Sequence, residues 1–317
     1  MDRRSFLRTA ACAVAVTAGC SALEDEQRGR RTATPRAGRA EQSEPRVREV
    51  TVEEGETWKH RLDDGETLEN VVIDISADGA GYSLHALAND WTIRNVGVRG
   101  KWDYEPSNSP FTLSVPDGEG SGVVRNFYLG DGGPANTGIY VHADHAGDLV
   151  LRNLNIQNVT DNGLYASDPG SPERVQNGQG GAVRVYDSYF RNNENPQCRL
   201  GTDESLAKNC VAVNETGGTA CFRDYWGAGV TFVNCDAYAP YGGGFKSGSS
   251  TWNERRDVRC RNRTYLENCR AKAAIPLYGP CRIEGRLRSE PRTEPPSGVP
   301  TSASEAAYES LGGSAGR

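Results

Sequence analysis

The side chains best suited to chemistry lie in short segments between residues 138 and 248 of this 317-residue chain. Tyr140 and Tyr165 offer flat aromatic faces that suit sugar rings. Arg223 and Lys246 offer positive charge for carboxylates, and His142 adds a group that can take up a proton near neutral pH. Together they predict a carbohydrate-binding surface, although an ordinary solvated strand face would carry similar polar residues.

Six segments with alternating polarity hold these residues, and each reads as a half-buried strand. The segments are 81–85, 110–114, 138–142, 163–167, 219–223 and 244–248. If such strands stack in register, one outward column reads Ser83, Thr112, Tyr140, Tyr165, Cys221 and Lys246. The next column reads His85, Ser114, His142, Ser167, Arg223 and Gly248. Three carboxylates lie at or just past the strand ends, namely Asp144, Asp168 and Asp224.

A second phrase, apolar-x-apolar-x-Asn-x-x-apolar, separates these segments and sets the architecture. Its polar position is Asn95, Asn126, Asn153, Asp187, Asn234 and Asn268, at spacings of 31, 27, 34, 47 and 34 residues. Asn tolerates the left-handed backbone of a sharp bend, and its amide can bond the amides of the coils on either side. The repeat predicts an all-β fold, a single-stranded parallel β-helix of about six to seven coils spanning 47–283. The long interval predicts an inserted loop near 192–217.

This pattern resembles the right-handed parallel β-helix, or pectin-lyase-like, superfamily over about residues 70–275. The resemblance rests on the repeat, not on a catalytic signature. It implies polysaccharide as the substrate, through either of two chemistries. A uronate lyase would use Arg223, Lys246 or His142 as its base, with Ca²⁺ a possible cofactor held by Asp144, Asp168 and Asp224. A glycosidase would use a carboxylate pair such as Asp168 and Asp224.

The N-terminus reads as an export signal. Arg3-Arg4 and Phe6-Leu7 precede a short run of small apolar residues, and the segment resembles a twin-arginine (Tat) signal. Residues 17–20 resemble a lipobox, which would make Cys20 the lipidated residue of an anchor at the extracellular face of the membrane. Ordinary cleavage near Ala18 would instead leave a secreted protein. The signal is thus expected over 1–20, a disordered tether over 21–46 and a disordered tail over 284–317, because the last two are poor in large apolar residues.

The net charge and the cysteine spacing bear on nucleic-acid binding, metal binding and disulfides. The formal net charge of −6 gives no argument for nucleic-acid binding, so no nucleic-acid partner is expected. Seven cysteines follow residue 197, without the paired spacing of a zinc site, so no metal centre is expected and disulfides are favoured. Cys198 and Cys210 could close the inserted loop, and Cys235 and Cys269 share one predicted column.

Taken together, the sequence predicts an exported surface protein that binds an extracellular polysaccharide; if the protein also cleaves it, a lyase is favoured over a hydrolase. The alternative is a non-catalytic structural or adhesive protein in which the β-helix is a rigid spacer. Whether the chain is an enzyme stays open at this point.

Overall fold

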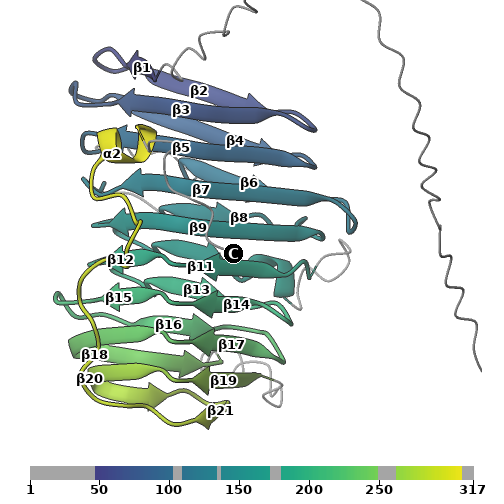
Figure 1. Ribbon diagram of the computed structural model, residues 1–317, viewed down its shortest axis with the longest axis vertical. Coiled ribbons are helices and arrows are strands. Elements are labelled where there is room, and N and C mark those ends of the chain that lie inside the picture. Colours follow the sequence, from purple (N-terminus) through teal and green to yellow (C-terminus); the bar gives the residue numbers. More distant parts are fainter. Residues whose placement is uncertain (1–46, 103–108, 134–136, 172–179, 249–261, 309–317) are drawn as a thin grey trace, which may run out of the picture. The chain divides into compact units, whose positions relative to one another are not determined.

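The predicted parallel β-helix is confirmed. The computed structural model describes residues 47–102, 109–133, 137–171, 180–248 and 262–308. All strand pairings within these residues are parallel, and the strands stack coil upon coil along one axis (Figure 1). The signal, the lipobox with Cys20 and the tether fall in residues 1–46, outside the described residues, and stay predictions. No helix in the described part of the chain is long and apolar enough to cross a bilayer.

One face of the β-helix is a ladder of short strands, here called the groove sheet, which carries the predicted site. It consists of β2 (Thr57–Leu62), β4 (Gly81–Leu87), β6 (Phe111–Ser114), β8 (Ile139–Val141), β10 (Leu164–Ala166), β13 (Cys198–Leu200), β16 (Ala220–Asp224) and the C-terminal parts of β18 (Asp236–Ser247) and β20 (Arg270–Tyr278).

The remaining strands form two further faces that meet at a bend. They are β1 (Arg48–Thr51), β3 (Thr67–Asp74), β5 (Trp91–Arg99), β7 (Ser121–Leu129), β9 (Asp148–Gln157), β11 (Val183–Tyr186), β12 (Tyr189–Arg191), β14 (Leu206–Lys208), β15 (Val211–Val213), β17 (Val230–Val233), β19 (Arg263–Glu267), β21 (Arg282–Gly285) and the N-terminal parts of β18 and β20. A 3₁₀ turn, η1 (Asp168–Gly170), and a short helix, α2 (Ala303–Ala307), complete the described elements.

The bend between these two faces is made by the predicted Asn column. The residue at the bend has a positive φ of 48° to 58° in eight successive turns: Asn70, Asn95, Asn126, Asn153, Asp187, Asn209, Asn234 and Asn268. Most L-residues resist this left-handed conformation, whereas Asn and Asp adopt it at lower cost. Of the eight turns, those at Asn70 and Asn209 were not assigned to the column from the sequence.

Hydrogen bonds between coils join the side chains of this column. Asn95 Nδ2 donates to Asn70 Oδ1 at 2.8 Å, and Asn126 Nδ2 donates to Asn95 Oδ1 at 2.7 Å. Farther along, Asn234 Nδ2 donates to Asn209 Oδ1 at 3.2 Å, and Asn209 Nδ2 donates to Asp187 Oδ1 at 3.0 Å. Each such amide therefore both permits the bend and fixes the vertical register of its coil.

The segment 192–217, predicted as an inserted loop, is instead part of the stack. Strands β13, β14 and β15 lie within it and pair in parallel with the coils on both sides. The sequence pattern missed this coil because the small residues Ser205 and Ala207 occupy the two apolar positions before Asn209.

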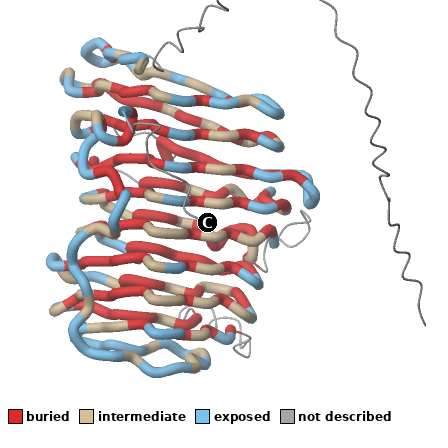
Figure 2. The backbone as a smooth tube through the Cα atoms, in the orientation of Figure 1, coloured by how far each residue is buried: buried red, intermediate tan, exposed pale blue. Residues whose placement is uncertain are grey.

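The core is a column of inward side chains, and five cysteines belong to it. Figure 2 shows buried positions recurring from coil to coil, except in the last strands β20 and β21, where no residue is buried. The cysteines Cys198, Cys210, Cys221, Cys235 and Cys269 are all buried free thiols. The predicted column of Cys235 and Cys269 exists, joined by Cys210, but neither predicted disulfide forms. The Cys235 and Cys269 thiols instead donate to the carbonyls of Ala207 and Phe232, at 3.3 and 3.2 Å.

Residues 286–308 form a strap that runs back along the outside of the stack, from the last coil toward the first (Figure 1). Val299 packs on Tyr189, Val211 and Val213, and the carbonyls of Gly298 and Pro300 accept hydrogen bonds from Asn153 and Asn155 at 2.6 and 2.8 Å. The expected disordered tail is thus wrong for residues 284–308, and residues 309–317 lie outside the described part.

Helix α2 ends the strap on β3, β5 and β7. Its Ala303, Ala306 and Ala307 are buried against Val72 and Tyr128. Gly97 lies between these two strand residues, and a Cβ there would come 2.1 Å from the Ala303 carbonyl oxygen, so only glycine allows the contact. A capping box, in which Ser302 Oγ accepts from Glu305 N at 3.0 Å, begins the helix.

Replacing Asn95 tests the Asn column. Asn95→Ala should lower the free energy of unfolding by about 2–3 kcal/mol, because it adds the left-handed backbone penalty and removes two amide hydrogen bonds. Asn95→Gly keeps the bend and loses only the hydrogen bonds, so it should be less destabilising than Ala. Urea unfolding followed by circular dichroism would measure both. Equal losses for Ala and Gly would show that the backbone conformation contributes nothing.

Candidate binding groove

The register of the groove sheet places eight side chains in one outward column. His85, Thr112, Tyr140 and Tyr165 pair in succession across β4, β6, β8 and β10. The column continues through the following residues of β13, β16, β18 and β20: Arg199, Arg223, Lys246 and Tyr278. The predicted site residues Tyr140, Tyr165, Arg223 and Lys246 therefore do lie in line on one face.

This register corrects two predicted columns. At the N-terminal end, His85 and not Ser83 is in register with Thr112, and Ser114 is in register with Leu87. At the C-terminal end, Arg223 was expected in the column next to that of Tyr165 and Lys246, and Cys221 was expected between those two residues in their column. In the structure Arg223 is in register with Lys246, while Cys221 is buried and its thiol donates to the Ala212 carbonyl at 3.4 Å. The coil at 192–217 supplies the reason. Its Cys198 pairs with Leu164 on one side and Phe222 on the other, which shifts β16 by two residues.

The first half of the column opens into a cavity of about 480 Å³. Tyr140, His142, Tyr165 and Asp168, all predicted site residues, line it. It is also lined by His85, Leu87, Ser109, Thr112, Thr137 and Asp161. The two tyrosine rings meet edge to face, with centroids 5.5 Å apart. A mixed wall of aromatic rings and hydroxyls of this kind suits a sugar ring.

Asp168 organises the floor of this cavity. It follows β10 in η1 and is nearly buried, with 9% of its surface exposed. Its carboxylate accepts from Tyr140 Oη at 2.6 Å and from Tyr165 Oη at 3.0 Å. Burial raises the pKa of Tyr165 to about 12, with Arg199 opposing and Asp168 adding to the rise. Tyr165 is therefore a protonated hydrogen-bond donor at neutral pH and not a base.

The second half of the column carries three cations on successive coils. Arg199 stacks between Tyr165 and Tyr225, with its Cζ 3.9 and 3.6 Å from the two ring centroids. Arg223 also contacts the Tyr225 ring, with its Cζ 4.1 Å from the ring centroid. Arg199 lies in the segment expected to loop out, so sequence reasoning missed it. The alternation around Cys198 and Leu200 was the available signal.

These cations have no carboxylate partner among the described residues. Arg199 donates to Ser167 Oγ at 2.7 Å and to Tyr165 Oη at 2.9 Å, and Arg223 donates to the Gly248 carbonyl at 3.4 Å. Arg223 Nε is buried without any hydrogen-bond partner. Burying a charge without a counter-ion is unfavourable, so this stripe is poised to accept an anion.

Burial and mutual repulsion shift the pKa values of this stripe. Burial, assisted by the charge of Arg199, lowers the pKa of Arg223 to about 10. Burial, assisted by Arg223, lowers the pKa of Lys246 to about 8. Lys246 is therefore mostly cationic at neutral pH and loses its proton in mildly alkaline solution.

The three predicted carboxylates do not converge. Asp224 is fully buried inside the coil, where Thr264 Oγ1 donates to it at 2.8 Å and Asn262 Nδ2 at 3.0 Å. Asp144 is half exposed, 3.4 Å from His142 Nδ1. Because Asp168 is held by two tyrosines and Asp224 faces inward, neither the predicted glycosidase pair nor the predicted Ca²⁺ ligand set fits. In the described part of the chain no group of three His, Cys, Asp or Glu could hold a metal ion.

The burial of Asp224 generates a pH prediction. Burial raises its pKa from 3.8 to about 7, with the hydrogen bonds from Thr264, Gly227 and Asn262 opposing the rise. Between these values the folded chain holds a proton that the unfolded chain has lost, so stability falls as pH rises from about 4 through about 7.

Relative to Asp224→Asn, the wild type should lose about 2–4 kcal/mol of unfolding free energy over that range. Urea unfolding at intervals of pH would measure the difference. Parallel pH profiles for the two proteins would contradict the assignment.

Comparison with known proteins identifies no relative. No family model, curated protein or solved structure matches the chain.

Proposed function

We propose that this protein is an exported, surface-anchored β-helix that binds an anionic, uronate-type extracellular polysaccharide along the groove sheet. The observation that carries the proposal is the stripe of Arg199, Arg223 and Lys246, three cations on successive coils without a carboxylate partner in the described residues. Adjacent coils lie roughly 4.8 Å apart. An extended polymer with one carboxylate on each sugar presents charges at a comparable repeat.

The adjoining cavity supports a polymer over a small anion. Tyr165 belongs to both halves of the column, because it lines the cavity and stacks on Arg199. A chain laid along the column would meet aromatic faces at one end and cations at the other. A spacer protein with only scattered serines and threonines on this face would need neither, so the structural or adhesive alternative leaves the stripe unexplained.

If the protein cleaves its ligand, elimination is the chemistry that the side chains favour over hydrolysis. In a uronate, a base takes the proton at C5, the C4–O bond breaks, a C4=C5 double bond remains, and the departing oxygen takes up a proton from water, while cations neutralise the carboxylate. Lys246, with its lowered pKa, is the best base in the stripe, and Arg223 or Arg199 can neutralise the carboxylate. His142, on the cavity wall, is the second candidate.

Titration calorimetry tests the binding proposal. An acidic oligouronide should bind, and a neutral oligosaccharide of the same length should bind at least tenfold more weakly. Arg223→Gln and Lys246→Gln should each weaken oligouronide binding about tenfold or more, since a hydrogen bond to a charged group contributes about 1.5–3 kcal/mol. Arg94→Gln, which removes an exposed arginine already paired with Glu69, is the matched control. Equal binding of both glycans would refute the proposal.

The pH dependence separates binding from catalysis. Oligouronide affinity should decline as pH rises through about 8, because Lys246 loses its charge. Lys246→Arg should move that decline to higher pH. If Lys246 is also the base, the ultraviolet absorbance of unsaturated product should appear at a rate that increases over the same range, and Lys246→Arg should abolish it. Binding with no unsaturated product at any pH would leave a binding protein and exclude the lyase.

A further inference from the structure

A second cavity, lined by cations, shares no residue with the first and lies at the C-terminal end of the Asn column. Its volume is about 470 Å³, and it is lined by Asn209, Asn234, Asn268, Arg270, Arg288 and Arg292. The lining contains three guanidinium groups and no carboxylate. Two of the arginines, Arg288 and Arg292, belong to the strap, and Arg270 begins β20.

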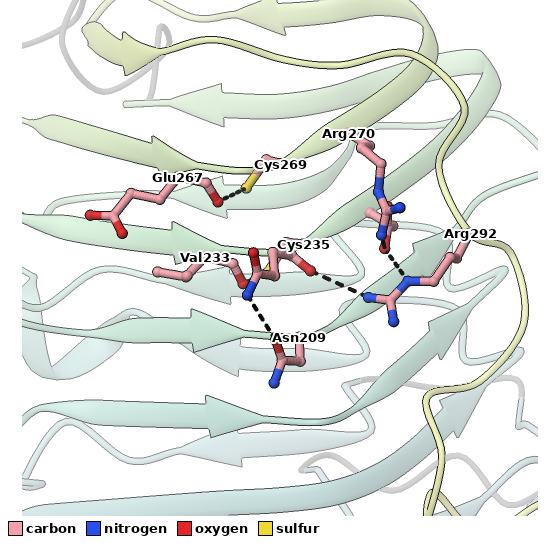
Figure 3. A network of polar contacts seen from close by, with 9 residues as sticks. Asn209, Val233, Cys235, Glu267, Cys269, Arg270 and Arg292 are labelled. Atoms are coloured by element: carbon pink, nitrogen blue, oxygen red, sulfur yellow. Dashed lines mark hydrogen bonds and ion pairs between the residues drawn. The ribbon is translucent and has the colours of Figure 1, made fainter.

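One buried carboxylate serves two of these arginines. Asp236 is fully buried in the adjacent coil and is bound by Arg270 through Nε and, at 2.8 Å, through Nη2. Arg292 Nε donates to the same carboxylate at 2.6 Å (Figure 3). Among the described residues, the side chain of Arg288 has only a long hydrogen bond, from Nη2 to Asn268 Oδ1 at 3.5 Å. Three positive charges are therefore balanced by one negative charge.

Several arginines elsewhere on the outer surface each have a carboxylate partner. Arg94 pairs with Glu69, Arg152 with Asp187, and Arg191 with Glu215, at 2.5 to 2.9 Å. Arginines that crowd around a shared cavity repel one another unless an anion lies between them. Three arginines converge on this cavity, and among the described residues only Asp236 is paired with any of them.

We propose that this cavity binds a tetrahedral oxyanion, a sulfate or a phosphate, either free or as an ester on a larger molecule. Guanidinium groups on β20 and on the strap approach the cavity from separate chain segments, which suits a ligand with oxygens in several directions better than a planar carboxylate. The Asn side chains add neutral donors and acceptors at the wall. The volume exceeds what one ion needs, so part of an ester's carrier would also fit.

Binding here would join the strap to the stack. The same anion would contact Arg288 and Arg292 from the strap and Arg270 from the last full coil, so it would hold these segments together. A ligand that binds only the folded arrangement stabilises it by RT ln(1 + [L]/Kd), so the unfolding temperature rises with ligand concentration. The site is independent of the groove and does not rest on the proposed polysaccharide binding.

Calorimetric titration of the full chain at low ionic strength, with inorganic sulfate, inorganic phosphate and acetate, tests the site. Sulfate or phosphate should bind saturably at one site, and acetate at least tenfold more weakly. Arg288→Gln should weaken oxyanion binding about tenfold or more and remove the accompanying rise in unfolding temperature. Arg288 is chosen because its side chain is exposed and does not hold Asp236.

Two controls locate the effect. Arg94→Gln should bind oxyanion as the wild type does, and Lys246→Gln should too, since it alters only the groove. Phenyl phosphate distinguishes the source: tighter binding than inorganic phosphate indicates an esterified ligand, and equal or weaker binding a free ion, and each upholds the site. The proposal is overturned if no oxyanion binds saturably, if acetate binds equally, or if either control variant loses as much affinity as Arg288→Gln.

Discussion

A left-handed residue at every bend is the constraint on which this molecule depends. Each coil must turn sharply between two strand faces, and the residue at that point has a φ near +50° in turn after turn. Asn satisfies the backbone and then uses its amide to bond the neighbouring coil. Because a strand has a period of two, a coil held in vertical register also has its inward and outward faces fixed. The line of side chains from His85 to Tyr278 is a consequence of that register.

Charge is distributed over this scaffold in two ways. Along much of the outer surface, arginines have carboxylates on the adjoining coil, and these exposed pairs contribute little to stability. In the groove, by contrast, Arg199 and Arg223 are held by tyrosine rings, which attract cations without neutralising them. Their positive charge remains available to a ligand. The price of this arrangement is the lowered pKa of Lys246, the most readily deprotonated of the three.

The architecture and half of the site could be predicted from the sequence, because both follow from periodicity. The alternation in 138–142 and 163–167 correctly placed Tyr140 beside Tyr165, and the Asn phrase located most of the bends. The missed Arg199 and the wrong register of β16 both came from one coil whose repeat is weak. The coil around Asn209 has Ser205 and Ala207 at the two positions where most other coils have larger apolar residues, so Arg199 was overlooked and β16 was displaced by two residues.

Other errors came from the limits of local reasoning. Asp224 adjoins Arg223 in the sequence, yet consecutive strand residues point to opposite faces, and its interior partners Asn262 and Thr264 lie about forty residues away. The strap was taken for a tail because its apolar residues are few and small. A small residue is what its docking site requires, since the backbone of α2 rests directly on Gly97.

The strap makes this β-helix different from a simple solenoid. A solenoid without one is a one-dimensional array, in which each unit interacts only with its neighbours and either end can fray independently. Here contacts join residues 145 and 205 positions apart, from Asn153 to Gly298 and from Arg99 to Ser304. The early coils thus receive their outer cover only when the last part of the chain has arrived and has followed the bends back. Docking of α2 therefore reports that every intervening coil is present and in register, which makes the end of the chain a physical check on the completeness of the rest.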